Sequence, residues 1–163
     1  MKKIVIAALL AGFSLSASAT QTLRFATEAS YPPFEFVDSD NKIQGFDVDL
    51  ANALCREIGA ECTFTNQAFD SLIPSLKFRR FDAVMAGMDI TPEREKQVLF
   101  TKPYYENSAL FITQKDKVAS VDALKGKRVG VQNGTTHQKY LGEKLADIKV
   151  VPYDSYQNAI LDL

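Results

Sequence analysis

Few side chains in this chain are of the kind that binds a transition metal. Its 163 residues include one histidine, His137, and two cysteines, Cys55 and Cys62. A structural zinc site needs more ligands of this type, and His137 is far from both cysteines in the sequence. We therefore expect neither a metal site nor a cofactor.

Long apolar runs are also scarce. The one long stretch, residues 4–15, is too short for a membrane-spanning helix, which needs about 20 residues. Two lysines precede it and the small residues 17–19 follow it, an order typical of a secretory signal peptide. We expect residues 1–19 to be removed by a cut after Ala19, leaving an exported, soluble chain.

Clusters of basic residues are missing as well. When Lys2 and Lys3 of the predicted leader are set aside, 17 of the 19 basic side chains remain against 20 acidic ones, a net charge of −3. So mild a charge, without a basic patch, does not favour nucleic acid or an anionic membrane surface as a partner. We expect a monomer that binds no nucleic acid.

Two cysteines in an exported chain meet an oxidising compartment. A bridge between Cys55 and Cys62 would close a small loop and contribute about 2 to 3 kcal/mol in the chain-entropy model. We interpret the pair as a structural disulfide that ties the end of a helix to the strand that follows it.

The first part of the chain alternates between strand and helix patterns. We predict strands at residues 23–27, 62–66 and 81–86, a helix over 46–58, and a further helix from about Asp70. Residues 28–33 contain two consecutive prolines and predict a loop without regular structure. The alternation implies right-handed parallel crossovers and a doubly wound α/β sheet covered on both faces.

The pattern changes after the first hundred residues. An extended run at 109–113 leads into a charged connector, which we interpret as the boundary between a first lobe, 20–113, and a second, 114–163. The second lobe is predicted to contain a short helix at 120–124, strands at 128–131 and 149–151, and helices over 136–145 and from 155. We expect this lobe to be incomplete, with the chain continuing past Leu163.

Residues 86–94 form a corner between a predicted strand and a predicted helix. Thr91 is a favoured N-cap and Pro92 a favoured first helical residue, so free backbone N–H groups should face an anion here. Arg94 adds a guanidinium suited to a carboxylate, and Asp89 a negative charge for an ammonium group. The alternative is that both charges are solvated beside an ordinary helix cap. A second corner of the same character, residues 132–136, could face the first across a cleft.

Several segments in the same order resemble the periplasmic polar-amino-acid-binding proteins of ABC importers. They are FATEASYPPFE (25–35), GFDVDLA (45–51), FDSLIPSL (69–76), ITPER (90–94) and LKGKRVGV (124–131). Within that family the chain most resembles the arginine-binding and the lysine-, arginine- and ornithine-binding members. The resemblance implies a two-lobed periplasmic-binding-protein fold of type II. It also implies capture of a cationic L-amino acid, most of all arginine, in the periplasm, and delivery to a membrane permease.

The resemblance also assigns roles to single residues near the two ends of an amino acid ligand. Arg94 matches the arginine that binds the ligand carboxylate, and Thr136 matches a second-lobe donor to the same group. Gly87 matches a carbonyl that accepts from the ammonium group, and Asp89 replaces a serine of the lysine-, arginine- and ornithine-binding members. Two neighbours, Ala86 and Thr135, complete this part of the predicted site.

Other residues match positions around the ligand side chain. Glu28 corresponds to an acidic position for the distal positive charge, and Tyr31 and Phe69 to aromatic positions that enclose a guanidinium. Gln132 and His137 match second-lobe positions nearby. Three of these residues have a structural alternative: Phe69 as a core residue, Tyr31 as a loop anchor and His137 as a helix-surface residue.

Two other functions use the same fold. A dehydratase-like enzyme would need its acid and base from Glu28, Asp89 or His137, because no serine–histidine pair is present. An amino-acid-sensing receptor domain is disfavoured by the predicted cleavable signal and the absence of a spanning segment.

Overall fold

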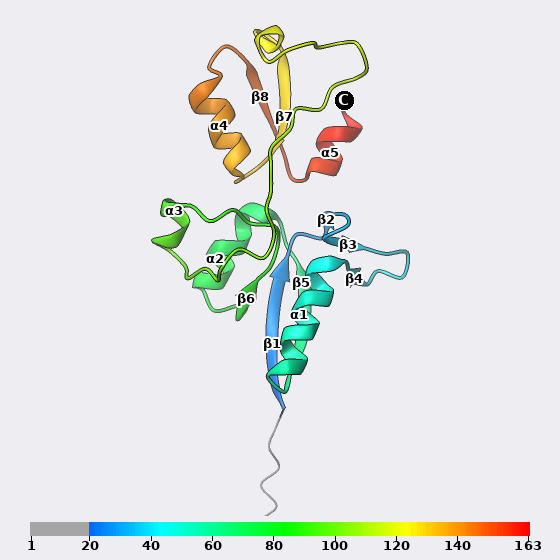
Figure 1. Ribbon diagram of the computed structural model, residues 1–163, viewed down its shortest axis with the longest axis vertical. Coiled ribbons are helices and arrows are strands. Elements are labelled where there is room, and N and C mark those ends of the chain that lie inside the picture. Colours follow the sequence, from blue (N-terminus) through cyan, green and yellow to red (C-terminus); the bar gives the residue numbers. More distant parts are fainter. Residues whose placement is uncertain (1–19) are drawn as a thin grey trace, which may run out of the picture.

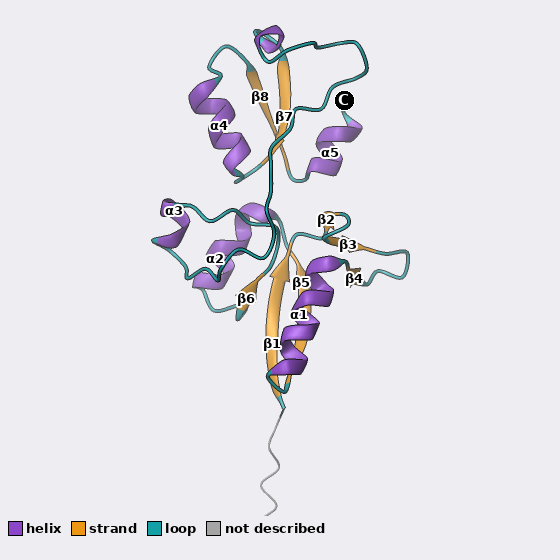
Figure 2. Ribbon diagram, viewed as in Figure 1, coloured by secondary structure: helices purple, strands orange, loops and turns teal. Residues whose placement is uncertain are grey.

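The computed structural model describes residues 20–163, so the predicted signal peptide lies outside the described residues. Its elements form two units arranged along the long axis (Figure 1). The N-terminal unit runs from β1 (Gln21–Thr27) to α3 (Pro92–Glu95), and the C-terminal unit from η2 (Asp122–Leu124) to α5 (Tyr156–Leu161). Between them, residues 96–121 contain no helix or strand and cross as loop (Figure 2). Within residues 20–163, no helix is both long enough and apolar enough to cross a membrane.

A parallel three-stranded sheet forms the centre of the N-terminal unit. Its order is β5 (Ala60–Asn66), β1, β6 (Ala83–Val84), with β1 in the middle. Helix α1 (Phe46–Glu57) connects β1 to β5, while η1 (Phe69–Ser71) and α2 (Leu72–Lys77) connect β5 to β6. The predicted strand–helix–strand alternation is confirmed, although β6 is shorter than the predicted 81–86.

Both faces of this sheet are covered, as expected. Neighbouring residues of a strand point to opposite faces, and on β1 Phe25 packs with Ala51 and Cys55, on the side of α1. Ala26 packs on the other side with Phe69 and Leu72 of η1 and α2. The hydrophobic core is therefore two layers divided by β1.

The disulfide prediction is confirmed. Cys55 near the end of α1 is bonded to Cys62 in β5, seven positions further on. Cys55 is buried in the same cluster as Phe25 and Ala51. The bridge therefore fixes α1 against the sheet at the point where the chain turns back into β5.

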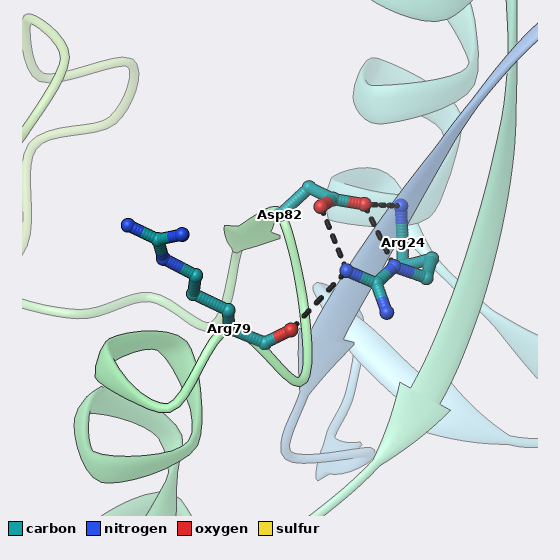
Figure 3. A network of polar contacts seen from close by, with 3 residues as sticks. All are labelled: Arg24, Arg79 and Asp82. Carbon is teal, nitrogen blue, oxygen red and sulfur yellow. Dashed lines mark hydrogen bonds and ion pairs between the residues drawn. The ribbon is translucent and has the colours of Figure 1, made fainter.

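A polar network joins the other edge of the sheet to β1 (Figure 3). The Arg24 guanidinium donates to both carboxylate oxygens of Asp82 at 2.9 Å, and its Nη2 also donates to the Arg79 carbonyl at 3.3 Å. These hydrogen bonds from Arg24 hold the pKa of Asp82 down to about 2. The network anchors the loop that leads from α2 into β6, and so fixes the start of the strand that precedes Ala86.

A small antiparallel sheet corrects the expectation of a loop without regular structure at 28–33. Its strands are β2 (Ser30–Tyr31), β3 (Glu35–Val37) and β4 (Ile43–Gln44), in that order. The prolines occupy the turn between β2 and β3, so Ser30 and Tyr31 before them are free to pair. The carbonyls of Pro33 and Phe34 then accept from the N–H groups of Phe46 and Asp47 at 3.0 and 2.9 Å. Backbone carbonyls thus cap the start of α1 and hold β3 above it.

The C-terminal unit contains a parallel pair, β7 (Arg128–Gln132) and β8 (Lys149–Tyr153), with α4 (Thr136–Lys144) between them in the chain. These elements agree with the predicted strands and helices to within two residues. The extended run at 109–113 is different, because no ladder joins it to any strand within the described part of the chain. The division into lobes at 113 and 114 stays a prediction.

Candidate functional site

One pocket lies where the two units meet, and all eleven residues predicted for the ligand site line it. Three further residues, for which no role was predicted, line it as well: Glu35, Asn107 and Tyr156. The predicted set is Glu28, Tyr31, Phe69, Ala86, Gly87, Asp89, Arg94, Gln132, Thr135, Thr136 and His137. The contribution of each residue to ligand binding stays a prediction.

The strands explain why residues distant in sequence meet here. Glu28 directly follows β1, Ala86 follows β6 by two residues, and Gln132 is the last residue of β7. In parallel α/β sheets, ligands bind in the crevice at the carboxyl ends of the strands. The pocket lies at the carboxyl ends of strands from both units.

Arg94 lines the part of the pocket that we call the Arg94 end, and it touches both units. Its Nη1 donates to the Asp89 carbonyl at 2.7 Å, and its Nη2 to the Gly134 carbonyl at 2.9 Å. The guanidinium also lies over the Phe69 ring, 5.6 Å from its centroid. Burial lowers the pKa of Arg94, and the negative charge of Asp89 partly opposes this. A guanidinium stays charged and has further N–H groups, so this end of the pocket can hold an anion.

The expected helix start before Arg94 is confirmed. Thr91 is the N-cap of α3, and its side chain accepts from the Arg94 N–H at 3.2 Å. Pro92 is the first helical residue. This turn fixes the backbone of Arg94, while the guanidinium contacts fix its far end.

Asp89 and Thr136 make a second contact between the units. The Thr136 hydroxyl donates to the Asp89 carboxylate at 2.5 Å. Thr136 is the first residue of α4, and Thr135 before it is the N-cap, accepting from the Gln138 N–H. The Asp89 carboxylate and the start of α4, with its free N–H groups, therefore lie beside Arg94. The carboxylate suits the ammonium group of an amino acid, and the N–H groups together with Arg94 suit its carboxylate.

The part of the pocket around Glu28, which we call its acidic end, also contains aromatic residues. Glu28 is 8% exposed, and its carboxylate accepts from the Ser30 hydroxyl at 2.5 Å. Phe69 belongs to the core cluster and also lines the pocket, and its role beside the ligand stays a prediction. Tyr31 stacks on Phe34 at 5.8 Å and lies 6.2 Å from the Tyr156 ring. A cationic side chain would find charge and ring faces here.

Gln132 and His137 complete the wall from the C-terminal unit. Gln132 is buried, and its amide donates to the Asp154 carbonyl at 3.1 Å. His137 lies half-buried, with Nδ1 2.5 Å from the Tyr156 hydroxyl. His137 is therefore a pocket residue and not only a helix-surface residue. Among residues 20–163, no group of three or more histidine, cysteine or acidic side chains is arranged to hold a metal ion.

A family model matches residues 23–155, which is more than half of the chain. The chain belongs to the bacterial extracellular solute-binding proteins, family 3. This membership confirms the resemblance drawn from the sequence motifs.

Several members of family 3 are similar to this chain in sequence or in structure. A protein of Escherichia coli (strain K12) is 76% identical over 163 residues, which are 100% of this chain and 67% of that protein. Another from the same strain, ABC transporter arginine-binding protein 1, is 62% identical with the same shares covered. A solved periplasmic binding protein of Salmonella typhimurium, described for its high arginine specificity, has 61% identity and a TM-score of 0.86. That match covers 88% of this chain and 65% of the other. The α/β periplasmic-binding-protein fold is thus confirmed, and the chain spans about two thirds of the length of these relatives.

Sequence reasoning on this family 3 protein missed three pocket residues, for different reasons. Glu35 closes one of the motifs that carry the resemblance, yet nothing in its neighbours marks it as buried. Tyr156 follows the N-cap of α5, Ser155, and only the packing of α5 against β2 brings it to the pocket. Asn107 lies in the segment without regular structure, where no sequence signal places a side chain.

Proposed function

We propose that this family 3 solute-binding protein captures a cationic L-amino acid, most of all arginine, and delivers it to the permease of an ABC importer. One observation carries the proposal: Arg94, the buried Glu28 and the aromatic rings of Tyr31 and Phe69 line a single pocket. A free amino acid with a cationic side chain has a carboxylate at one end and a positive charge at the other. The names of its relatives, which describe arginine binding, support the same ligand.

Within this proposal each end of the pocket has its own task. Arg94, with Thr135 and Thr136 at the start of α4, binds the ligand carboxylate, and Asp89 with the Gly87 carbonyl receives the ammonium group. Glu28 meets the guanidinium, which lies between Tyr31 and Phe69. Gln132, His137 and Ala86 shape the remaining walls.

The proposal includes a place and a partner. The protein acts in the periplasm after removal of residues 1–19, and the two units act as lobes, divided near residue 113, that close on the ligand. The closed form is what the permease recognises. The function requires no chemical reaction and no cofactor.

A thermal-shift panel tests which amino acid the protein binds. We expect arginine, among the twenty amino acids, ornithine and citrulline, to raise the melting temperature of the full-length protein most. A ligand at 100 times its dissociation constant stabilises by about 2.7 kcal/mol. A shift with arginine no larger than that with alanine would reject the proposal.

The variant Arg94→Ala tests whether Arg94 binds the ligand carboxylate. Hydrogen bonds to charged groups contribute about 1.5 to 3 kcal/mol each, so we expect every amino acid to bind at least about 100-fold more weakly in calorimetry. Arg80→Ala is the matched control, because Arg80 is exposed on the same unit and is not among the pocket residues. Near-native affinity of Arg94→Ala would remove Arg94 from the site.

A further inference from the structure

A second layer of carboxyl groups lies at the acidic end of the pocket. Glu28 and Glu35 both line the pocket, and Asp47 lies next to Glu35 in the first turn of α1. Glu35 and Asp47 are each 1% exposed. Behind them, the Tyr104 hydroxyl donates to Asp47 Oδ2 at 2.7 Å. Two buried acids, Glu35 and Asp47, thus lie near Glu28, the acidic residue that was predicted from the sequence.

If both acids were carboxylates, each would keep one buried oxygen without a hydrogen bond. Within the described residues, Glu35 Oε2 and Asp47 Oδ1 are inaccessible to solvent and have no hydrogen-bond partner. Burial without a partner is costly for a carboxylate and is avoided when the group holds a proton. Burial first, then the charge of Asp47, then the hydrogen bond that a protonated Glu35 can donate to Asp47, and then the charge of Glu28, raise the pKa of Glu35 to about 9. The raised pKa favours the protonated form of Glu35.

The backbone prevents these groups from moving apart. Glu35 follows Phe34, whose carbonyl accepts from the Asp47 N–H at 2.9 Å. The other titratable neighbour, Tyr104, is held as a donor, because burial and its hydrogen bond to Asp47 raise its pKa. All the charged groups that act most strongly on Glu35 are carboxylates: Asp47 from α1 and Glu28 from the end of β1. A positive charge at this place has to come from a ligand.

We propose that Glu35 is a further specificity-determining residue, which holds a proton until a cationic side chain enters the pocket and then releases that proton to solvent. The O–H bond of the carboxylic acid breaks, the proton passes to the buffer, and the resulting carboxylate pairs with the incoming cation. A neutral side chain leaves the proton in place and gains no such pair. The inference rests on the proposed function, because it assumes that a cationic side chain occupies this end of the pocket.

Proton release on binding can be counted in the wild-type, full-length protein. Titrations of arginine and of citrulline, its uncharged analogue of the same shape, are repeated at pH 7.5 in buffers of different ionisation enthalpy. We expect arginine to release up to about one proton per molecule and citrulline none. The ratio of arginine affinity to citrulline affinity, in which the shared ammonium group cancels, should then rise with pH until Glu35 has lost its proton in the free protein as well. Arginine binding without proton release would overturn the role of Glu35.

The variant Glu35→Gln keeps the shape and a hydrogen-bond donor but has no proton to release. We expect proton release to disappear and the preference for arginine over citrulline to fall about 10-fold. The exposed Glu57 on α1 supplies the control, Glu57→Gln, which should change neither quantity. An unchanged preference together with unchanged release in Glu35→Gln contradicts the inference.

The outcomes separate the two proposals. A wild-type protein that binds no arginine contradicts the proposed function itself. A wild-type protein that binds arginine but releases no proton contradicts only the role of Glu35. If Glu35→Gln does not fold, the proton count in the wild-type protein still decides the question.

Discussion

At the scale of single residues, the two ends of the pocket differ in how their charges are held. Arg94 is oriented by two backbone carbonyls and by the Phe69 ring, so its position depends on several elements at once. Glu28 is held by its neighbour Ser30, and the backbone next to it by Asn66, whose side chain accepts from the Ala29 N–H at 2.8 Å. Recognition of the ligand backbone and of the ligand side chain should therefore respond to different substitutions.

The variant Glu28→Gln tests this separation. Removing the negative charge should weaken arginine binding by roughly 10- to 100-fold, because a hydrogen bond to a charged group contributes about 1.5 to 3 kcal/mol. Binding of glutamine, whose side chain is uncharged, should hardly change. Calorimetry with both amino acids measures the two effects. Equal losses for arginine and glutamine would show that Glu28 does not read the side-chain charge.

The burial of Glu35 could not be predicted from the residues next to it in the sequence. The motif at 25–35 indicated the family, and through it the role of Glu28, yet an acidic residue in a strand is usually exposed. Glu35 is buried because β3 lies over the start of α1, and that contact joins positions that no sequence pattern connects. Arg94 and Asp89 were predicted from the corner between a strand and a helix, and the other residues from the resemblance, whereas the missed ones depend on packing between elements.

At the scale of elements, the sequence predicted helix α1 but not which of its faces is buried. Phe46, Leu54 and Ile58 predict the helix by their spacing, but all three are exposed by 46% or more. The buried side consists of smaller residues, Val48, Ala51 and Cys55. The disulfide and the crossover to β5 hold this small-residue face close to the sheet. Periodicity thus predicted the helix correctly, and tertiary packing decided which side is buried.

The start of α1 depends on a glycine. A Cβ atom on Gly45 would lie 2.3 Å from the Phe34 carbonyl oxygen, and its φ of 128° is a conformation that side chains rarely adopt. Gly45→Ala must break the carbonyl cap that holds β3 and Glu35, so we expect a loss of about 2 to 3 kcal/mol in urea unfolding. Gly142→Ala, in open space within α4, is the control and should gain about 0.5 to 1 kcal/mol. Two variants of equal stability would contradict the capping role.

At the scale of the whole molecule, the two units touch through the packing of α5 against β2 and through a small set of polar contacts. Arg94 to the Gly134 carbonyl and Thr136 to Asp89 lie in the pocket, while Lys139 and Glu93 form an ion pair at 3.1 Å outside it. Both members of that pair are more than half exposed, so it contributes little. The contacts that matter most for bringing the units together are therefore the same ones that line the ligand site.

Gly134 sets how closely the units approach. A Cβ atom there would lie 2.8 Å from the Asp70 Cβ and 3.0 Å from its Cα, across the gap between the units. We expect Gly134→Ala to keep the units apart, weakening arginine and lysine alike by about 10-fold or more, since closure is lost for every ligand. Small-angle scattering with saturating arginine should show a larger radius of gyration than in the wild-type protein.

Gly126→Ala separates this effect from backbone strain. Gly126 has the same φ of 74° as Gly134, but a Cβ atom there meets nothing within 4 Å. Both variants carry the cost of a left-handed residue, about 1 to 2 kcal/mol, and only Gly134→Ala places an atom between the units. We expect Gly126→Ala to lose stability while retaining arginine affinity and the compact scattering profile. If the two variants bind arginine equally well, approach of the units at Gly134 is not required for binding.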